Sequence, residues 1–297
     1  MTDLKNILSD GTKASDPSNS LLYDFSEGSA SATFYFRQFK VENVAKLKED
    51  GSTGTIPPEM VSIMELFRTK LHTEAILVEL GGSWHQNRSG DPYRYFSNYF
   101  PLDISYTSMF NYTKLFDRQA VVSNAESLPF KDASLDAVFT HTFLEHPIHP
   151  EKVLSEVVRV LRPGGIVVHC DAWHCRWWQR YGIVGVKKFG SMSFKEKMIF
   201  FTAKLTEIKF IRFPMIVFKR AFKEFGSSKR SPIKLRYRKL DPNYELHLYA
   251  DEDAASSIDP LDVIRFYESR GFRLVEKKTF FQRIFYRDID VRLRKSI

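Results

Sequence analysis

Acidic, amide and histidine side chains follow a series of apolar segments in this chain, at points where parallel strands would end. Glu79, Gly81 and Gly82 lie at the end of the apolar run 75–80, and Asp103 lies near the end of the next run. The series continues along the chain with Asn124, Ala125, Glu126 and His141. Open parallel sheets bind ligands at the carboxyl ends of their strands, where an acid after the second strand can accept hydrogen bonds from ribose hydroxyl groups. The order of these residues therefore predicts a nucleotide-type site.

The glycine turn after residue 80 departs from the usual nucleotide-binding pattern. Such turns continue with small residues because the backbone approaches the nucleotide closely, but Ser83 and Trp84 follow the glycines here. Asp91 and Pro92 would supply an N-cap and a first-turn proline, so we expect a longer loop before a late, short helix. A dinucleotide site would need Gly-x-Gly-x-x-Gly, which "GGSWHQ" does not supply, so NAD binding is disfavoured.

Alternating apolar strands and helices must position these residues. The β-branched and apolar runs predict strands at 75–80, 99–105, 118–130, 135–142 and 165–173. Between the fourth and fifth runs, "HPEKVLSEVVRVLRPGG" places its leucines and valines on one helical face. The closing Pro163-Gly164-Gly165 should stop that helix. This alternation predicts an α/β fold in which helices cover both faces of a parallel sheet.

The segments outside this core suggest how the chain is divided. Residues 33–50 and 57–72 have the pattern of helices, and 259–272 has the pattern of a third helix followed by two short strands. The connection after the fifth strand is far longer than an ordinary loop, so it should have structure of its own. We predict a mobile tail at 1–20, a helical segment at 21–74, a core with the ligand site at 75–175, an insertion or lid at 176–257, and a part at 258–297 that completes the core sheet.

Composition narrows the setting in which the protein works. The chain has 297 residues and a hydrophobic content of 43%, which is ample for a packed core. Its two cysteines, Cys170 and Cys175, do not form a disulfide framework and favour a reducing, cytoplasmic location. The first residues lack the pattern of a signal peptide, and no run of 18 apolar residues predicts a spanning helix.

Five successive stretches resemble the motifs of class I S-adenosylmethionine-dependent methyltransferases, of the kind called methyltransferase type 11. They are "VELGG", "PLDIS", "NAESLPF", "LDAVFTHTFLEH" and "EKVLSEVVRVLRPGGIVV", and together they cover about residues 75–172. The resemblance implies a Rossmann-like, doubly wound, seven-stranded and mostly parallel sheet whose final strand is antiparallel. It also implies S-adenosylmethionine as the methyl donor.

The same resemblance implies roles for the matching residues. Glu79 and the backbone of Gly81 and Gly82 would lie near the methionine part of the donor, and Asp103 with Ile104 would hold the ribose. The remaining donor-binding positions are Asn124, Ala125 and Glu126 beside the adenine, with His141 nearby. The chain departs from the family where Ser83 replaces the second glycine and where Asn124 replaces the more usual aspartate, although an amide oxygen can still accept from the adenine amino group.

A hydroxyl acceptor must also lose its proton during methyl transfer, and histidine suits that role near neutral pH. His141, His174 and His247 are candidate bases by position, whereas His146 is better explained as a structural histidine. The stretch "HCDAWHC" resembles a metal-binding cluster, but strand alternation puts His169 and Asp171 on the face opposite Cys170. No second group of ligands completes a set at a familiar spacing, so we predict no metal.

Positive charge is concentrated in the predicted insertion. Residues 186–240 contain 16 lysines and arginines against three acidic residues, whereas the whole chain carries a net charge of +8. Within it, 194–225 interleaves aromatic, aliphatic and basic residues. Three interpretations stay open: peripheral contact with an anionic membrane, a basic collar for an acidic acceptor, and a helical lid whose lysines are solvated.

The function predicted first is methyl transfer from S-adenosylmethionine to a hydroxyl of a small-molecule, glycan or lipid-linked acceptor. A second hypothesis is a methyltransferase-like binding module without turnover, which the altered glycine turn motivates. A third is an RNA methyltransferase that uses the basic insertion. The [D/N]PP[Y/F] motif typical of nucleobase amine methylation is absent after the fourth strand, where the chain reads "THTF". Nucleic acid is therefore disfavoured as a partner.

Overall fold

The computed structural model describes the chain in separate stretches, which are residues 7–9, 13–14, 21–24, 58–82, 96–181, 187–207, 209–225, 232–243, 253–285 and 290–297. Three sequence predictions fall outside the described residues. They concern the helix at 33–50, the longer loop and the late, short helix within 83–95, and the candidate base His247.

The chain folds as two compact units. The first comprises Met1–Phe143, His149–Asp171 and Ile289–Ile297, and the second comprises Leu144–Ile148 and Ala172–Asp288. The helix near residue 260 thus belongs to the second unit. The sequence had predicted that all of 258–297 completes the core sheet.

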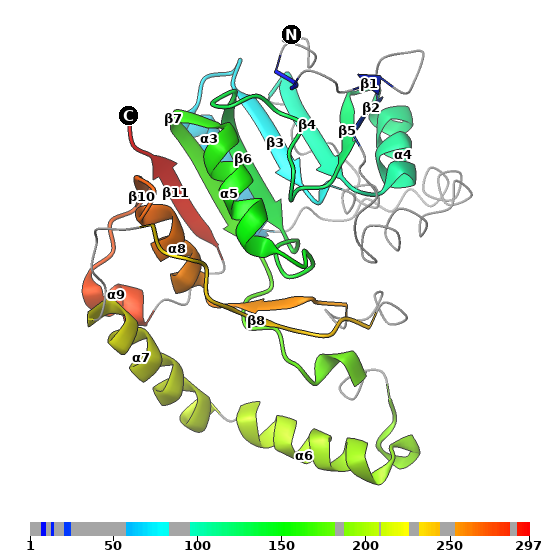
Figure 1. Ribbon diagram of the computed structural model, residues 1–297, viewed down its shortest axis with the longest axis vertical. Helices are drawn as coiled ribbons and strands as arrows, with labels where there is room; N and C mark the ends of the chain where they lie inside the picture. Colours follow the sequence, from blue (N-terminus) through cyan, green and yellow to red (C-terminus); the bar gives the residue numbers. More distant parts are fainter. Residues whose placement is uncertain are drawn as a thin grey trace. The chain divides into compact units, whose positions relative to one another are not determined.

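A mostly parallel sheet forms the centre of the first unit (Figure 1). Its strands run in the order β1-β2-β5-β4-β3-β6-β7-β11. All neighbours from β2 to β7 are parallel, whereas β1 is antiparallel to β2 and β11 is antiparallel to β7. The strands are β1 (Lys13–Ala14), β2 (Leu21–Asp24), β3 (Ile76–Leu80), β4 (Asn98–Asp103), β5 (Ala120–Ser123), β6 (Leu135–His141), β7 (Leu161–Cys170) and β11 (Val291–Lys295). This arrangement confirms the predicted Rossmann-like α/β fold.

The N-terminal segment extends this sheet at one edge, which the sequence did not predict. β2 pairs with β5 from Leu21 opposite Ala120 to Asp24 opposite Ser123, and β1 adds a further short strand. These residues fall in stretches predicted as a tail and as the start of a helical segment. Strands of two and four residues are too short to show a period of two in the sequence. The backbone groups of the β5 edge pair with β2, which in turn pairs with β1.

Helices cover both faces of the sheet (Figure 1). α3 (Pro58–Lys70) and α4 (Tyr106–Phe116) bury their apolar side chains in one cluster with β3, β4 and β6, whereas α5 (Pro150–Val160) covers the other face. α3 confirms the helix predicted at 57–72. α5 ends at Val160, three residues before the predicted proline stop, because Leu161 already takes an extended conformation and begins β7.

The second unit combines helices with short strands. Its elements are two 3-10 helices (Gln179–Tyr181 and Phe189–Ser191), α6 (Phe194–Glu207), α7 (Lys209–Phe225), β8 (Tyr237–Lys239), β9 (Ser256–Ile258), α8 (Pro260–Glu268), β10 (Phe272–Leu274) and α9 (Phe280–Ile284). β8 and β9 form an antiparallel pair. Across the described residues, none of the helices has the length and apolar character needed to cross a bilayer.

Candidate functional site

The strand register brings the sequence-predicted residues of the first unit to one edge of its sheet. Leu80 of β3 pairs with Leu102 of β4 and with Thr140 of β6. The residues that come next along the chain are Gly81 after β3, Asp103 on β4 and His141 on β6. Neighbouring strands lie about 4.8 Å apart, so these three residues are close together. Asn124 follows β5 at the same edge, because Asp103 pairs with Val122. This edge is the carboxyl edge of the parallel strands, where sheets of this type bind ligands.

The glycine turn at this edge has room for glycine only. Gly81 has a φ of +78°, and an added Cβ would lie 2.5 Å from Cδ2 of Phe143. At Gly82 an added Cβ would lie 2.6 Å from Cβ of Pro101. The Gly81 amide also donates to the Leu102 carbonyl at 2.8 Å, which fastens the turn to β4. The backbone of the turn is thus held close against Phe143 and Pro101.

Glu79 lies inside the sheet below this turn. Its side chain is 1% exposed, and the hydroxyl of Tyr99 donates a hydrogen bond to its Oε2. A buried carboxylate needs such a partner, so the pair anchors the strand that carries Gly81. A direct contact of Glu79 with the methionine part of a donor stays a prediction.

Asp103 is held by the junction between β4 and α4. Its Oδ1 accepts from the amide of Ser105 at 2.8 Å. Ser105 in turn caps α4, because its hydroxyl accepts from the amide of Ser108 at 3.3 Å. Asp103 and the adjoining Ile104 are both partly exposed. A fixed, accessible carboxylate of this kind suits a ligand with vicinal hydroxyl groups.

The segment after β5 forms a turn that is stabilised by its own side chains. Oδ1 of Asn124 accepts from the Glu126 amide at 2.9 Å, and the Asn124 carbonyl accepts from Ser127 at the same distance. Ala125 is buried between them. Oε1 of Glu126 accepts from the His149 amide at 3.0 Å, so this acid lies at the N-terminus of α5, where the helix dipole favours it. Glu126 therefore has a structural role, and its contact with an adenine stays a prediction.

The candidate bases have different surroundings. His141 ends β6, is 8% exposed, and its Nε2 lies 3.9 Å from Oε1 of Glu59 on α3. His174, in the second unit, has a φ of +63°, and its Nε2 lies 3.4 Å from Nη2 of Arg220. Because a guanidinium only donates, that nitrogen of His174 accepts. His146 lies 3.5 Å from Asp253 through Nδ1, in keeping with a structural role.

A buried polar network, which the sequence did not predict, lies behind the carboxyl edge of the sheet. The Thr140 hydroxyl donates to Oδ2 of Asp171 at 2.7 Å and lies 2.9 Å from Nδ1 of His169. Oδ1 of Asp171 accepts from the amide of Phe143 at 3.0 Å. Phe143 is the residue whose ring closes over Gly81. The network thus fixes the loop after β6 against the glycine turn.

Asp171 stays ionised within this network. Burial alone would raise the pKa of its carboxyl, but His169, the Phe143 amide and the Thr140 hydroxyl outweigh burial and lower that pKa below its ordinary value. Strand alternation did indicate that His169 and Asp171 share a face. Thr140 lies on a different strand, 31 residues before Asp171, so no local sequence pattern links it to them.

Side chains in the stretch from His169 to Cys175 pack in the core and form hydrogen bonds. Cys170 is buried in the core cluster on the opposite face, and burial raises the pKa of its thiol to about 12, which leaves the thiol protonated and unreactive. Within the described part of the chain, His, Cys, Asp and Glu side chains form no group of three or more that suits a metal ion.

The residues at the carboxyl edge fit a nucleoside-bearing ligand. Two glycines hold a close backbone turn, Asp103 presents a carboxylate to hydroxyl groups, and the Asn124 turn follows on the adjoining strand. A family model described as a methyltransferase domain matches residues 83–169. This match confirms the resemblance to class I methyltransferases, which use S-adenosylmethionine as methyl donor.

Curated relatives match a short part of the chain. The demethylmenaquinone methyltransferase of Clavibacter sepedonicus is 45% identical over 51 residues, which are 17% of this chain and 21% of that protein. The phthiotriol/phenolphthiotriol dimycocerosates methyltransferase 1 of Mycobacterium ulcerans is also 45% identical over 51 residues, or 17% of this chain and 19% of that protein. The chain thus spans about a fifth of the length of these relatives.

Solved structures of methyltransferases also resemble the chain. A putative methyltransferase of Bacillus halodurans is 12% identical and aligns with a TM-score of 0.46 over 81% of this chain and all of that one. The phosphoethanolamine N-methyltransferase 2 of Haemonchus contortus, solved with S-adenosyl-L-methionine, is 21% identical with a TM-score of 0.37, over 48% of this chain and 36% of that one.

Proposed function

We propose that this chain, which contains a methyltransferase domain over residues 83–169, transfers a methyl group from S-adenosylmethionine to a hydroxyl of a small-molecule, glycan or lipid-linked acceptor. The observation that carries the proposal is the meeting of the Gly81 turn, Asp103 and the Asn124 turn at the carboxyl edge of one parallel sheet. In this assignment Asp103 accepts hydrogen bonds from the ribose hydroxyls, and the Asn124 turn borders the adenine.

The donor supplies a methyl group that is already activated, so the contribution of the protein is chiefly positioning. Phe143 and the Asp171 network hold the glycine turn in place, and the turn fixes the donor. A hydroxyl acceptor must lose its proton as the new carbon–oxygen bond forms. His141 suits this role best among the candidate bases described, because it ends the strand next to the one that carries Gly81. Glu59, near its Nε2, would favour the imidazolium that results.

The names of two relatives support a lipid-like acceptor. One is named for demethylmenaquinone and another for dimycocerosates, and each matches 51 residues of this chain. A lipid-linked acceptor would also give the basic and aromatic segment 194–225 a purpose, since the enzyme would meet such an acceptor at a membrane. We therefore include peripheral membrane contact in the proposal.

Donor binding is tested by calorimetric titration of the full chain with S-adenosylmethionine and S-adenosylhomocysteine. We expect Asp103→Asn to weaken binding by about 10- to 100-fold, the scale of about 1.4–2.8 kcal/mol for a lost charged hydrogen bond. Asparagine keeps an oxygen for the Ser105 amide, so the fold at this junction should persist. Glu65→Gln, an exposed acid on α3, is the matched control and should bind as the natural chain does. Equal affinity of the Asp103 variant would contradict the assigned site.

Turnover is tested separately with a methyl-labelled donor and a panel of hydroxylated acceptors that includes isoprenoid quinone precursors and lipid extracts. Label in the extracted organic phase would support the enzyme with a lipid-like acceptor. Donor binding without label in any acceptor would favour a binding module without turnover. Label recovered in added RNA would favour the nucleic-acid alternative, whose affinity should fall steeply with salt.

A further inference from the structure

The two long helices of the second unit expose apolar side chains on a scale unusual for a surface. On α7, Met215 is 69% exposed and Phe218 and Phe222 are each 76% exposed. Their spacing of three and four residues places them on one side of the helix. A contiguous run of large exposed apolar side chains marks an interaction surface rather than an ordinary solvated face.

Three charged side chains of α7, those of Arg220, Lys223 and Glu224, lie on the side opposite these apolar residues and are largely buried. Arg220 is 3% exposed and donates to both carboxylate oxygens of Asp259, at 2.9 to 3.2 Å. Lys223 is 7% exposed and pairs with Asp262. Glu224 accepts from Arg283 of α9 at 3.0 Å. At these positions α7 therefore buries charged residues and exposes aromatic ones, which is the reverse of a normal surface helix.

These ion pairs fix the orientation of α7. Turning the helix to bury Phe218 and Phe222 would take Arg220 and Lys223 away from their carboxylates. An uncompensated buried charge is costly, and Asp259 is also the N-cap of α8. The aromatic side is therefore held outward by the packing of the second unit itself.

α6 adds a second exposed apolar face. Phe194, Met198, Phe201 and Leu205 are between 52% and 81% exposed and recur every three or four residues. Its other side packs Ile199 and Ala203 against Trp178 and Met192. We define the α6–α7 face as Phe194, Met198, Phe201, Leu205, Met215, Phe218 and Phe222.

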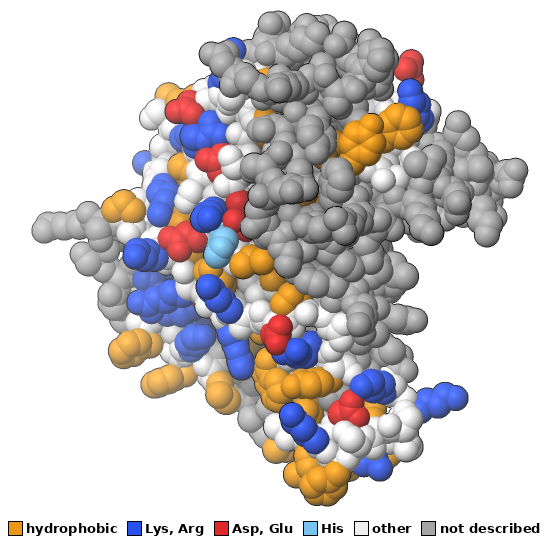
Figure 2. Space-filling model, turned by 45° about the vertical axis from the view of Figure 1, so that its right-hand side comes forward, with side chains coloured by type: hydrophobic (Ala, Val, Ile, Leu, Met, Phe, Trp, Pro, Cys, Tyr) orange, Lys and Arg blue, Asp and Glu red, His pale blue; other side chains and the backbone are white. Residues whose placement is uncertain are grey.

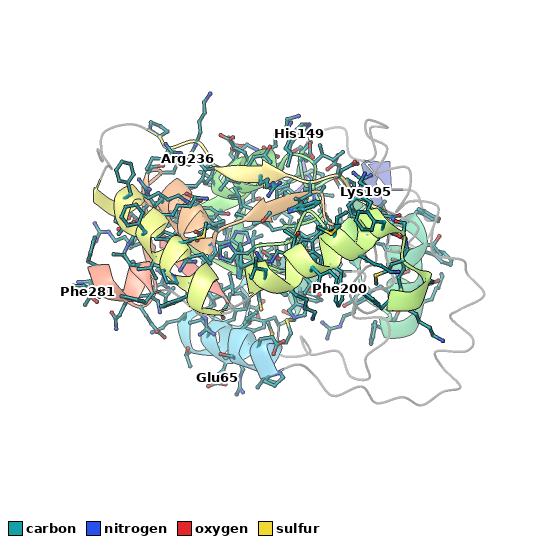
Figure 3. All side chains as sticks on the ribbon, turned by 90° about the horizontal axis from the view of Figure 1, so that it is seen from below. Glu65, His149, Lys195, Phe200, Arg236 and Phe281 are labelled. Carbon is teal, nitrogen blue, oxygen red and sulfur yellow. The ribbon has the colours of Figure 1, made fainter. Side chains whose placement is uncertain are left out.

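Basic side chains accompany the α6–α7 face. Lys195 and Lys204 of α6 and Lys219 of α7 are exposed, and Lys195 extends from the α6 ribbon in Figure 3. Figure 2 shows apolar side chains lying among lysines and arginines on the side of the molecule that it draws. Helices that lie in a membrane interface combine these features, because aromatic rings enter the headgroup region while lysines reach anionic headgroups.

We propose that the α6–α7 face inserts into the interfacial layer of an anionic lipid bilayer. The charge pattern favours this occupant over a second copy of the chain. Two copies facing each other would place Lys195, Lys204 and Lys219 of one copy near the same lysines of the other, and like charges repel. The inference does not rest on methyl transfer, since binding to lipid is measured without donor or acceptor.

The test is flotation of the full chain with vesicles of phosphatidylcholine alone or mixed with phosphatidylglycerol. We expect binding to the anionic vesicles that weakens as salt is added. Phe218→Ser with Phe222→Ser should reduce that binding by about tenfold or more for each ring removed. Val61→Ser is the matched control, because Val61 is an exposed apolar residue of α3 in the other unit and its loss should leave binding unchanged.

Three results would overturn the proposal. They are absence of binding to either vesicle, equal binding to both kinds of vesicle, and equal binding by the double phenylalanine variant. Light scattering of the eluted chain distinguishes the competing occupant, because a dimer that the double variant dissociates would assign the α6–α7 face to self-association. Unchanged thermal unfolding of the double variant would show that its loss of lipid binding is not a loss of folding.

Discussion

At the residue scale, the two glycines of the turn are constrained for different reasons. Gly81 needs a positive φ and faces the ring of Phe143, whereas Gly82 is blocked by Pro101 of the neighbouring strand. A side chain at either position would push the turn away from β4 or from the loop after β6. The backbone course of the turn therefore depends on both.

We expect Gly81→Ala to destabilise the first unit by about 1–3 kcal/mol, because alanine is strained at this φ and its Cβ meets Phe143. Urea unfolding monitored by circular dichroism measures the change. Gly190→Ala is the control, since no atom lies within 4 Å of its added Cβ, and its midpoint should stay at that of the natural chain. Equal stability of the two variants would mean that the turn relaxes freely.

Asp171 should give the first unit a pH-dependent component of stability. Its pKa is lower in the folded chain than in the unfolded chain, so its contribution is present above the ordinary aspartate pKa of about 3.9 and is lost as the pH falls through the lowered folded value. We expect Asp171→Asn to cost about 1–3 kcal/mol at pH 7, and the difference from the natural chain should shrink toward pH 3. Urea unfolding of both chains at pH 7, 5 and 3 measures this, and a difference independent of pH would refute the role. Asp132→Asn, whose carboxylate is largely exposed, serves as control.

At the element scale, buried ion pairs hold α7 in the second unit. Lys223 and Asp262 are both buried, and burial raises the pKa of the Asp262 carboxyl despite the ammonium beside it. Removing either residue therefore leaves the charge of the other buried without its partner.

We expect Lys223→Met to destabilise the second unit by about 3–5 kcal/mol at pH 7. The loss should be smaller at pH 5, because Asp262 can then be protonated more easily. The double variant Lys223→Met with Asp262→Leu should recover most of the stability, since both buried charges are gone. A double-mutant cycle by thermal unfolding tests this. If the double variant were no better than the single one, apolar packing rather than charge would hold α7.

The elements that could be predicted from the sequence are those with a strong period. β3 was predicted from the dense apolar run at 75–80. α5 was predicted from the regular spacing of leucines and valines before "RPGG". α4 was not predicted, since "YTSMFNYTKLF" mixes polar and apolar residues, and its start depends on the Ser105 cap. β1 and β2 are too short for a pattern, and β2 pairs with β5, about a hundred residues away.

The site could be predicted in its order along the chain but not in its contacts. Asp103 and the Asn124 turn follow their strands as expected, because the ends of parallel strands must meet at one edge. The Tyr99 hydroxyl on Glu79 and the Thr140 hydroxyl on Asp171 could not be predicted, because each joins residues of two strands whose register is set by packing. The inversion of α7 also escaped prediction, since its period places Arg220 opposite Phe218 but does not say which side faces the core.

At the scale of the whole molecule, the first unit depends on the last residues of the chain. Val291 and Leu293 of β11 are fully buried, and Nζ of Lys295 donates to the carbonyls of Val158 and Leu161 at 2.7 Å. β11 also covers the edge of β7. The sheet of the first unit thus includes a strand that is remote in sequence from its other strands.

We expect deletion of residues 290–297 to destabilise the first unit by at least about 3 kcal/mol, because two fully buried aliphatic side chains are lost at about 1.5–3 kcal/mol each. The bared edge of β7 should also promote aggregation. Thermal unfolding and light scattering measure both effects. Removal of Ile297 alone is the control, since its side chain is fully exposed, and it should change neither. Normal melting of the longer deletion would show that β11 is dispensable.

The pairing of β11 with β7 has a consequence for how such a chain can diversify. Val291 lies opposite His169, so the chain leaves the sheet after β7 and returns to it on the adjacent strand, within about 5 Å of its point of departure. A connection between neighbouring antiparallel ends can be a turn of a few residues or a unit as large as residues 172–288, because the sheet imposes no length on it. The family match stops at residue 169, at this junction. Chimaeras cut at 171 and 289, which exchange the residues between β7 and β11, measure whether the parallel core strands fold independently of that unit.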